Sequence, residues 1–356
     1  LLPPIMGATA FIMAETLGIQ YREIVIAAAI PAIIYYLGII FQIQLKASKE
    51  DLGGMSKEDL PSLSETLKNY WHLTIPILFL VYMLFFSGFT VIRGAFFTII
   101  LTIIVAQLRK KTRMSIKDIQ DAFISSAKST VATAIACACV GIVIGVSSLT
   151  GFTINMASAI ISLGSTSLLL TLLFTMISCM ILGMGLPSIP AYIITSTIAA
   201  PALVKLGVIP LAAHLFCFYF AMFANITPPV ALASFAAAGI SGANPMKTGI
   251  VSVKLALAGF IVPYMFIYNN QLLLINTNII QGIQVTITAC VGVFLISSSV
   301  EGYLYRKLSI LMRIFMMAGA FLLINSSTLT DLVGIGVFLI ILLYEKFISK
   351  KEHKII

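Results

Sequence analysis

Residues 181–190 read Ile-Leu-Gly-Met-Gly-Leu-Pro-Ser-Ile-Pro, and this stretch decides the fold. One apolar run leads into it, and a second apolar run leaves it and reaches Pro201 and Lys205. Within a plain helix, a glycine costs about 1 kcal/mol and a proline about 3 kcal/mol relative to alanine. Two glycines and two prolines within eight residues therefore predict two helices joined by an unwound tip, and they argue against one kinked helix packed closely on a neighbour.

A second interruption follows at residues 223–230, which read Phe-Ala-Asn-Ile-Thr-Pro-Pro-Val. Pro228 and Pro229 remove two backbone donors and clash with the preceding turn, so the helix over 208–224 must break before a small-residue helix over 231–240. In hydrocarbon, freed backbone groups are tolerated only where protein or a water-lined cavity satisfies them. Both interruptions are therefore candidate binding sites.

The composition requires a lipid environment. Hydrophobic residues make up 60% of the 356 residues, charged residues only 10%, and the mean hydropathy is +1.07. A soluble domain is roughly half apolar and about a quarter charged, so the chain is predicted to be an all-α polytopic membrane protein. Its basic residues gather in short loops, which is the positive-inside pattern, and the net charge of +9 gives no reason to expect nucleic-acid binding. The five cysteines lie in apolar segments without metal-ligand spacing, which fits buried small hydrophobes and indicates neither disulfides nor zinc.

Apolar runs long enough to cross a bilayer predict a set of membrane spans. They are 24–44, 72–88, 90–107, 126–148, 208–224, 249–269, 278–300, 308–324 and 330–347. The basic segments 109–121 and 302–307 and the tail from Lys346 are placed in the cytoplasm. Residues 72–107 and 308–347 then form helical hairpins with outer turns at Ser87-Gly88 and Asn325-Ser326-Ser327, and residues 149–164 form an arm on the outer face.

An internal repeat is also present. Pro3-Pro4-Ile5-Met6-Gly7-Ala8-Thr9-Ala10-Phe11 resembles Pro228-Pro229-Val230-Ala231-Leu232-Ala233-Ser234-Phe235. The expected spans give five crossings between the two half-helices when residues 181–190 are a re-entrant hairpin. Because five is odd, the two units are expected to have opposite orientations, and inverted repeats with broken helices are typical of transporters.

The interruptions supply the candidate site residues. Unwound carbonyls can ligate Na⁺ without burying a charge, and the half-helix that begins after Pro187 points its positive end at the site, where it suits a substrate carboxylate. Beside the Pro-Pro break, the Thr227 hydroxyl has no other evident partner, and the Asn225 amide oxygen is a further possible ligand. The predicted substrate- and ion-binding set is Gly183, Gly185, Pro187, Ser188, Ala224, Asn225, Thr227, Pro228, Pro3 and Pro4; the predicted Na⁺ ligands are Gly183, Gly185, Ala224, Asn225 and Thr227.

One histidine and three lysines in or near the apolar segments are interpreted as structural residues and not as site residues. His214, within an apolar span, fits a packed or interfacial histidine better than a proton relay. Lys205, Lys247 and Lys254 fit anchors near helix ends whose ammonium groups reach the interface.

Four motifs resemble the fused permease of tripartite ATP-independent periplasmic (TRAP) transporters, the large membrane subunit called DctM. They are Gly-Met-Gly-Leu-Pro-Ser at 183–188, Ala-Pro-Ala-Leu-Val-Lys-Leu-Gly at 200–207, Pro-Leu-Ala-Ala-His-Leu-Phe at 210–216 and Ile-Thr-Pro-Pro-Val-Ala-Leu-Ala at 226–233. Residues 3–15 resemble the first-repeat counterpart, and the resemblance covers about residues 1–270. The chain begins Leu1-Leu2-Pro3-Pro4 without an initiator methionine, so we expect an N-terminally truncated sequence that lacks the first re-entrant hairpin.

The resemblance implies a sodium-driven importer of a small organic acid in the bacterial or archaeal cytoplasmic (inner) membrane. It implies an extracytoplasmic solute-binding protein and a small four-helix membrane subunit, or its fused equivalent, as partners. It also implies an elevator mechanism, in which hairpins and broken helices slide against a scaffold, with Na⁺ as coupling ion and no other cofactor. Many relatives carry an acid where this chain has Asn225, so a carboxylate ligand is not expected there.

Two other classes of function remain as alternatives: a membrane-embedded enzyme, for which no paired carboxylates or histidine cluster is found at membrane depth, and a structural membrane subunit. No phosphate-binding loop is present, because Gly-Met-Gly-Leu-Pro lacks the following Lys-Ser/Thr. The expected organisation is the end of a first-repeat transport unit (1–23), a span (24–44), a cytoplasmic loop (45–71), scaffold spans and outer arm (72–164), the second re-entrant hairpin (165–206), a broken helix of the transport domain (207–247), further spans (248–300), and a C-terminal hairpin with a basic tail (301–356).

Overall fold

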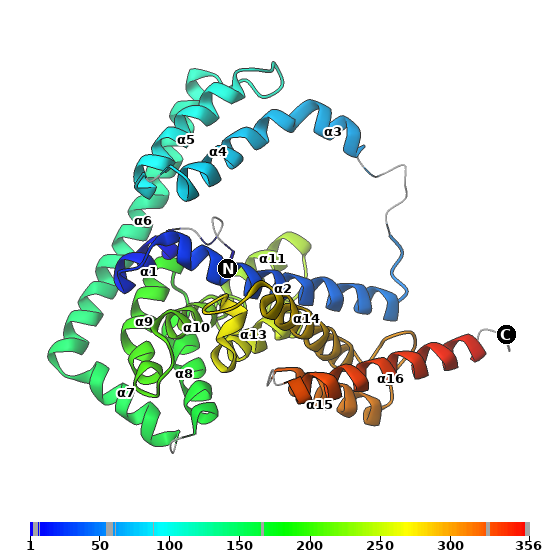
Figure 1. Cartoon of the computed structure of the whole chain (residues 1–356). Coiled ribbons are helices and arrows are strands. Elements are labelled where there is room, and N and C mark those ends of the chain that lie inside the picture. Colours follow the sequence, from blue (N-terminus) through cyan, green and yellow to red (C-terminus); the bar gives the residue numbers. More distant parts are fainter. Residues whose placement is uncertain are drawn as a thin grey trace.

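The computed structural model describes residues 1–2, 6, 8–54, 60, 62–87, 89–164, 167–324 and 328–352, and these residues are almost entirely helical (Figure 1). The α-helices are α1 (Thr9–Leu17), α2 (Tyr21–Lys49), α3 (Leu63–Tyr70), α4 (Thr74–Phe85), α5 (Val91–Ala106), α6 (Ile116–Leu149), α7 (Phe152–Leu163), α8 (Leu168–Gly183), α9 (Ser188–Lys205), α10 (Pro210–Phe223), α11 (Leu232–Ser241), α12 (Pro245–Leu255), α13 (Leu257–Tyr268), α14 (Ile279–Glu301), α15 (Ile310–Ile324) and α16 (Thr328–Glu352). Two 3₁₀ turns are η1 (Trp71–Leu73) and η2 (Asn270–Leu273). The all-helical prediction is confirmed.

Five of the described helical segments are long and apolar enough to cross a membrane: Tyr21–Lys49, Ile116–Leu149, Ser188–Lys205, Pro245–Tyr268 and Ile279–Glu301. Shorter apolar helices accompany them, including α5, α8, α10 and α15. Together with the composition, these segments make the chain a multi-pass membrane protein.

Several helix boundaries differ from the sequence-based expectation. The helix expected over 126–148 begins at Ile116, because Ser115 and Asp118 form a reciprocal capping box that starts it within the basic segment. The loop expected over 45–71 is partly helical, since α2 continues to Lys49 and α3 follows with Ser62 as its N-cap. Of the two expected outer turns, Asn325-Ser326-Ser327 lies outside the described residues, as does Gly88 of the turn at Ser87-Gly88.

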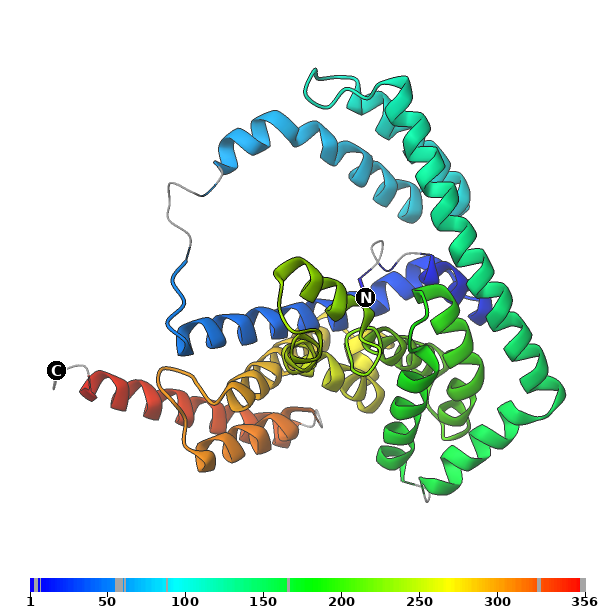
Figure 2. The same cartoon turned by 180° about the vertical axis from the view of Figure 1, so that it is seen from behind.

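The helices form a packed body and an extension. In both views, α8–α10 and α13–α14 cluster with α1 and α2, whereas α3, α4 and α5 stand away from this body and α6 runs along its side to α7 (Figures 1 and 2). The core of the body is aromatic and centres on α10. The ring centroids of Phe223 and Phe260 are stacked 4.7 Å apart, and those of Phe216 and Phe220 meet edge-on at 4.7 Å. This core fixes α10, and with it the position of the Pro-Pro break.

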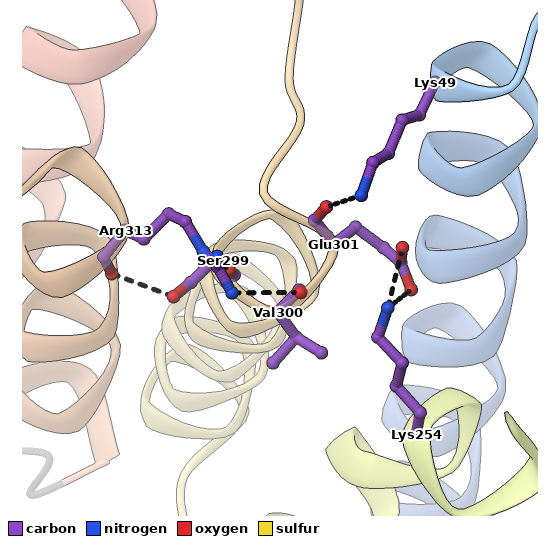
Figure 3. Close-up of polar contacts among 6 residues, drawn as sticks. All are labelled: Lys49, Lys254, Ser299, Val300, Glu301 and Arg313. Carbon is purple, nitrogen blue, oxygen red and sulfur yellow. Dashed lines mark hydrogen bonds and ion pairs between the residues drawn. The ribbon is translucent and has the colours of Figure 1, made fainter. Parts of the chain in front are cut away.

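A cluster of charges joins α2, α12, α14 and α15 at the end of α14 (Figure 3). The Lys254 ammonium lies 3.0 Å from a carboxylate oxygen of Glu301, whose side chain is only 2% exposed while that of Lys254 is 43% exposed. The Lys49 ammonium donates to the Glu301 carbonyl at 2.6 Å, and the Arg313 guanidinium donates to the Ser299 carbonyl at 2.7 Å. Lys254 therefore lies near a helix end with a partly exposed side chain, as expected, and in addition pairs with a buried carboxylate that the sequence did not indicate.

The two partners of this ion pair should have unequal effects on stability. Lys254→Ala leaves a buried carboxylate without its partner, which costs about 3–5 kcal/mol for a fully buried pair. Glu301→Gln leaves a lysine that already reaches water, and exposed pairs contribute only about 0–1 kcal/mol. In detergent, the thermal unfolding midpoint should fall clearly more for Lys254→Ala than for Glu301→Gln. Equal midpoints for the two variants would contradict a buried, unequal pair.

Candidate functional site

The first part of the site is the tip between α8 and α9. The last turn of α8 ends at Gly183, and Gly185 follows with φ +74°, a backbone conformation that favours glycine. The Gly183 carbonyl accepts from the Leu186 amide at 3.3 Å, which closes a tight turn. Pro187 then precedes α9 as its N-cap, with extended backbone. The predicted interruption of the helix is therefore present, and only four residues separate α8 from α9.

The second part is the break between α10 and α11. The α10 helix ends at Phe223, and the chain unwinds through Thr227 and the two prolines before α11 begins at Leu232. The two ends are held to each other, because the Ala233 amide donates to the Asn225 carbonyl at 2.9 Å and the Ser234 hydroxyl donates to the Ile226 carbonyl at 3.1 Å. The freed backbone is thus partly satisfied within the break itself.

The structure brings these two parts together. A side-chain carbon at Gly183 would lie 2.9 Å from the Ala221 Cα and 3.0 Å from the Ala221 carbonyl oxygen, so α8 and α10 approach backbone to backbone at their last turns. A side-chain carbon at Gly185 would lie 3.6 Å from the Val230 Cγ1 atom. The two interruptions around 183–188 and 224–230, although about forty positions apart in sequence, therefore lie next to each other and make one candidate site.

The polarity of this site follows from its helix ends. The carboxyl-terminal ends of α8 and α10 converge, and the amino-terminal ends of α9 and α11 begin a few residues later. Carboxyl-terminal ends carry partial negative charge and amino-terminal ends carry partial positive charge. The arrangement can therefore present carbonyls to a cation and amides to an anion within the same small region.

The Thr227 hydroxyl has a partner that the sequence did not reveal. It donates to the Phe223 carbonyl at 2.8 Å, so the expectation that this oxygen has no other role is wrong. The bond uses the hydroxyl proton and leaves the lone pairs of the oxygen available to a cation. Thr227 and Asn225 are both half-buried, whereas Ala224 is buried and has only its carbonyl to offer.

The first repeat contributes α1, which packs on α9 and α10. Pro3 and Pro4, the predicted site residues of this repeat, lie outside the described residues. The helix that follows them resembles its counterpart α11: both end at a left-handed glycine, Gly18 with φ 66° and Gly242 with φ 69°. In both cases a polar N-cap, Gln20 or Asn244, then starts the next helix. The repeat found in the sequence is thus accompanied by matching local structure.

One polar pair beside the site was not foreseen. The Tyr192 hydroxyl of α9 lies 2.8 Å from the His214 Nδ1 atom of α10, and the two side chains tie the hairpin to the broken helix. His214 is therefore a packed histidine with a polar partner. Neither residue carries a sequence signal for the pair, because the contact depends on how α9 crosses α10.

An apolar cavity of about 530 Å³ lies apart from these residues. It is lined by α8, α13 and α15, mainly by Leu173, Met176, Phe260, Tyr264 and Phe321. Its lining has no charged group and includes none of the tip residues, so it does not present the carbonyls and amides that the tip and the break share.

Comparison with known proteins gives one positive result. The family described as "Tripartite ATP-independent periplasmic transporter, DctM component" matches residues 1–281 of the chain. No curated protein and no solved structure matches the chain. The family match includes both the hairpin tip and the Pro-Pro break.

Proposed function

The chain belongs to the DctM component family of tripartite ATP-independent periplasmic transporters, and from this premise we propose that it couples the import of a small organic acid to sodium. It is the membrane subunit of such a transporter, and the family is one of transporter permeases and not of enzymes. The proposal has three parts: the coupling ion, the substrate and the movement that carries the substrate across the membrane.

The observation that carries the sodium proposal is the convergence of two helix carboxyl ends, where Gly183 of α8 lies against the backbone of Ala221 in the last turn of α10. In a membrane, a cation site built from backbone carbonyls avoids the cost of a buried carboxylate. Thr227 and Asn225, both half-buried in the break that follows α10, could add side-chain oxygens. Asn225 supplies a neutral amide oxygen, whereas an acid at this position would bring a negative charge that neutralises a bound sodium ion. With Asn225, each bound sodium ion would therefore leave the site with a net positive charge.

That positive charge supports an anionic substrate. The amino-terminal end of α9, beginning at Ser188, lies next to the tip, and its unpaired amides favour a carboxylate. A sodium ion bound at the neighbouring carbonyls would attract the same group. Sodium and a carboxylate would then each stabilise the other, which is the basis of coupling between their gradients.

Movement of the site is the third part of the proposal. We propose that α8–α11 slide as one unit against α6 and the spans around it, because a polar substrate cannot cross hydrocarbon unshielded. We also propose that the two repeats have inverted orientations in the membrane and that the α8–α9 hairpin is re-entrant. Repeat-built transporters commonly alternate access by such relative movement.

The partners follow from the family. TRAP permeases of this kind work with a periplasmic binding protein and a small membrane subunit. We propose that this chain receives its substrate from such a binding protein and resides in the cytoplasmic membrane of a bacterium or archaeon. Of the alternative functions, the family match disfavours a membrane-embedded enzyme, and the site at the two broken helices disfavours a purely structural subunit.

Uptake by proteoliposomes tests the proposal. The transporter, supplied with its small subunit and binding protein, should accumulate a radiolabelled carboxylate from a panel of small mono- and dicarboxylates only when sodium is higher outside. A potassium gradient of the same size is the control. Uptake that ignores sodium would exclude sodium coupling, and sodium-dependent uptake without the binding protein would exclude delivery by that partner.

Thr227→Val should raise the sodium concentration needed for half-maximal uptake. The two side chains have nearly the same shape, so the change removes the oxygen and leaves the packing. Loss of one neutral polar interaction costs about 0.5–1.5 kcal/mol, which corresponds to a roughly two- to tenfold weaker apparent affinity. Thr227→Ser keeps the hydroxyl and should keep the sodium dependence. An unchanged half-maximal concentration in the valine variant would remove Thr227 from the ligand set.

A further inference from the structure

The short helix α3 has an apolar face that no described part of the protein covers. Leu63, Leu67 and Tyr70 recur at helical spacing on one side, and their exposed fractions are 74%, 54% and 42%. Glu65 and Lys68 occupy the opposite side. A short helix with this division of residues is suited to lie at an interface between an apolar and an aqueous phase.

The chain leads directly from this helix into an apolar one. Trp71, 54% exposed, begins the 3₁₀ turn that joins α3 to the apolar helix α4. Tryptophan and tyrosine are enriched at the headgroup level of membranes, and Tyr70 and Trp71 are adjacent here. This order of residues is typical of a segment at the edge of a bilayer, and the apolar face of α3 and Trp71 are both exposed.

A basic turn lies beside α3. It comprises residues 107–115 between α5 and α6 together with Ile116 and Lys117, the first two residues of α6. The ammonium and guanidinium groups of Lys110, Lys111, Arg113 and Lys117 belong to exposed residues. The turn is ordered, because the Gln107 side chain donates to the Met114 carbonyl at 2.8 Å. The nearest acids of α6 are Asp118, whose carboxylate is used in the helix cap, and Asp121. Four exposed cations against two carboxylates leave an excess of positive charge.

Two contacts fix the basic turn to α3. The Arg109 guanidinium donates to the carbonyls of Lys68 and Asn69, the latter at 3.2 Å, in the last turn of α3. The His72 Nε2 atom lies 3.0 Å from the Thr112 hydroxyl. The two segments lie side by side in both views (Figures 1 and 2). The apolar face and the cations thus belong to one surface.

We propose that α3 and the basic turn form a docking surface for anionic phospholipids of the cytoplasmic leaflet. The apolar face of α3 rests among the acyl chains, and the four cations contact the phosphate groups above them. Charge complementarity identifies the occupant: a protein partner would satisfy the apolar face, but only an anionic surface also satisfies the four exposed cations. The positive-inside bias explains cations in this turn, yet it does not require an amphipathic helix attached to them.

Trp71 is the single tryptophan of the chain, so its fluorescence reports on this surface alone. The full chain would be reconstituted into vesicles of phosphatidylcholine and phosphatidylglycerol in which one lipid at a time carries brominated acyl chains, which quench tryptophan on contact. At equal mole fractions, brominated phosphatidylglycerol should quench Trp71 at least about twice as strongly as brominated phosphatidylcholine. The excess should decline with added salt, because screening weakens exposed charge interactions.

Matched variants separate the charges from the membrane contact. Lys110→Gln, Lys111→Gln, Arg113→Gln and Lys117→Gln together should bring the two quenching values to equality. Glutamine at Lys128, Lys205, Lys247 and Lys307, which are also exposed, should leave the excess intact. The double variant Leu63→Ser and Leu67→Ser should reduce quenching by both lipids, because α3 then lacks the apolar side chains that contact the acyl chains.

Three results would overturn the proposal. Equal quenching by the two lipids in the unmodified chain would mean that the surface contacts lipid without selecting charge. Absence of quenching by either lipid would mean that a protein, either another subunit or a second copy, covers α3. An excess that persists in the basic-turn variant would place the selecting charges elsewhere.

Discussion

Gly183→Val is expected to reduce sodium-driven uptake at least about tenfold while the protein still folds and inserts. A valine side chain at this position would meet the Ala221 backbone at 2.9–3.0 Å, and a backbone cannot move aside as a flexible side chain can. Overpacking of this kind costs about 1–3 kcal/mol, and each 1.4 kcal/mol taken from the productive geometry is about a tenfold loss of rate. Separation of α8 from α10 would also part the two helix ends that we propose hold sodium.

Gly141→Val is the matched control. Gly141 also lies in a helix, but a side-chain carbon there would meet no atom within 4 Å. Both substitutions place a β-branched residue in an α-helix, so differences in helix propensity cancel. Uptake should be nearly unchanged for Gly141→Val, and size-exclusion profiles should be the same for both variants. Full uptake by Gly183→Val would show that the close approach of α8 and α10 is not needed for transport.

The sequence predicted the interruptions of the site because each has a local cause. Two consecutive prolines, Pro228 and Pro229, remove two backbone donors and clash with the preceding turn, and Gly183, Gly185 and Pro187 also disfavour a continuous helix. The structure has breaks at both places. What the sequence did not contain was the reason for a glycine at position 183 in particular. That reason is the proximity of Ala221, which lies on another helix.

Contacts between distant residues account for the other differences. Glu301 closes an apolar helix and carries no signal that it pairs with Lys254, since the pair depends on the placement of α12 beside α14. The contact between Tyr192 and His214 depends in the same way on α9 and α10. Helix periodicity describes which face of a helix is apolar, but it does not state which helix covers that face.

The boundaries of α3 and α6 illustrate a different limit. The basic segment after α5 was treated as a loop because it is polar, yet Ser115 and Asp118 form a cap that starts α6 there. The residues of α3 are too polar on average to indicate a span, and their amphipathic pattern occupies only two turns. Local capping and short amphipathic patterns therefore decided structure in places where mean hydropathy indicated only a loop.

The structure also identifies which helices contact the hairpin that we propose to move. The hairpin α4–α5, one part of the scaffold expected over 72–164, stands away from α8 and α9 (Figure 1). Two other helices of the expected scaffold and outer arm, α6 and α7, contact the site hairpin. At α6, Val140 and Ile144 pack with Ile194 and Ile198 of α9 and with Leu186 at the tip. Sliding of the α8–α9 hairpin would therefore move it along α6 and α7, and the contact with α6 gives the movement a defined interface to test.

Joining α6 to α9 is expected to reduce transport to the level of empty vesicles. The cysteine pair Val140→Cys and Ile194→Cys, placed in a background without native cysteines, lies in the shared apolar contact and can be bridged by mercuric ion. If the hairpin moves along α6, a bridge at this interface stops the cycle in one state, and removal of the metal with excess thiol should restore uptake.

The control retains native Cys179 and Cys217, whose thiols are in contact between α8 and α10, and removes the other cysteines. A bridge within the proposed moving unit should leave uptake intact. If the fully bridged α6–α9 pair transported at the normal rate, the site would have to be fixed and access would have to be controlled by local gates near the tip.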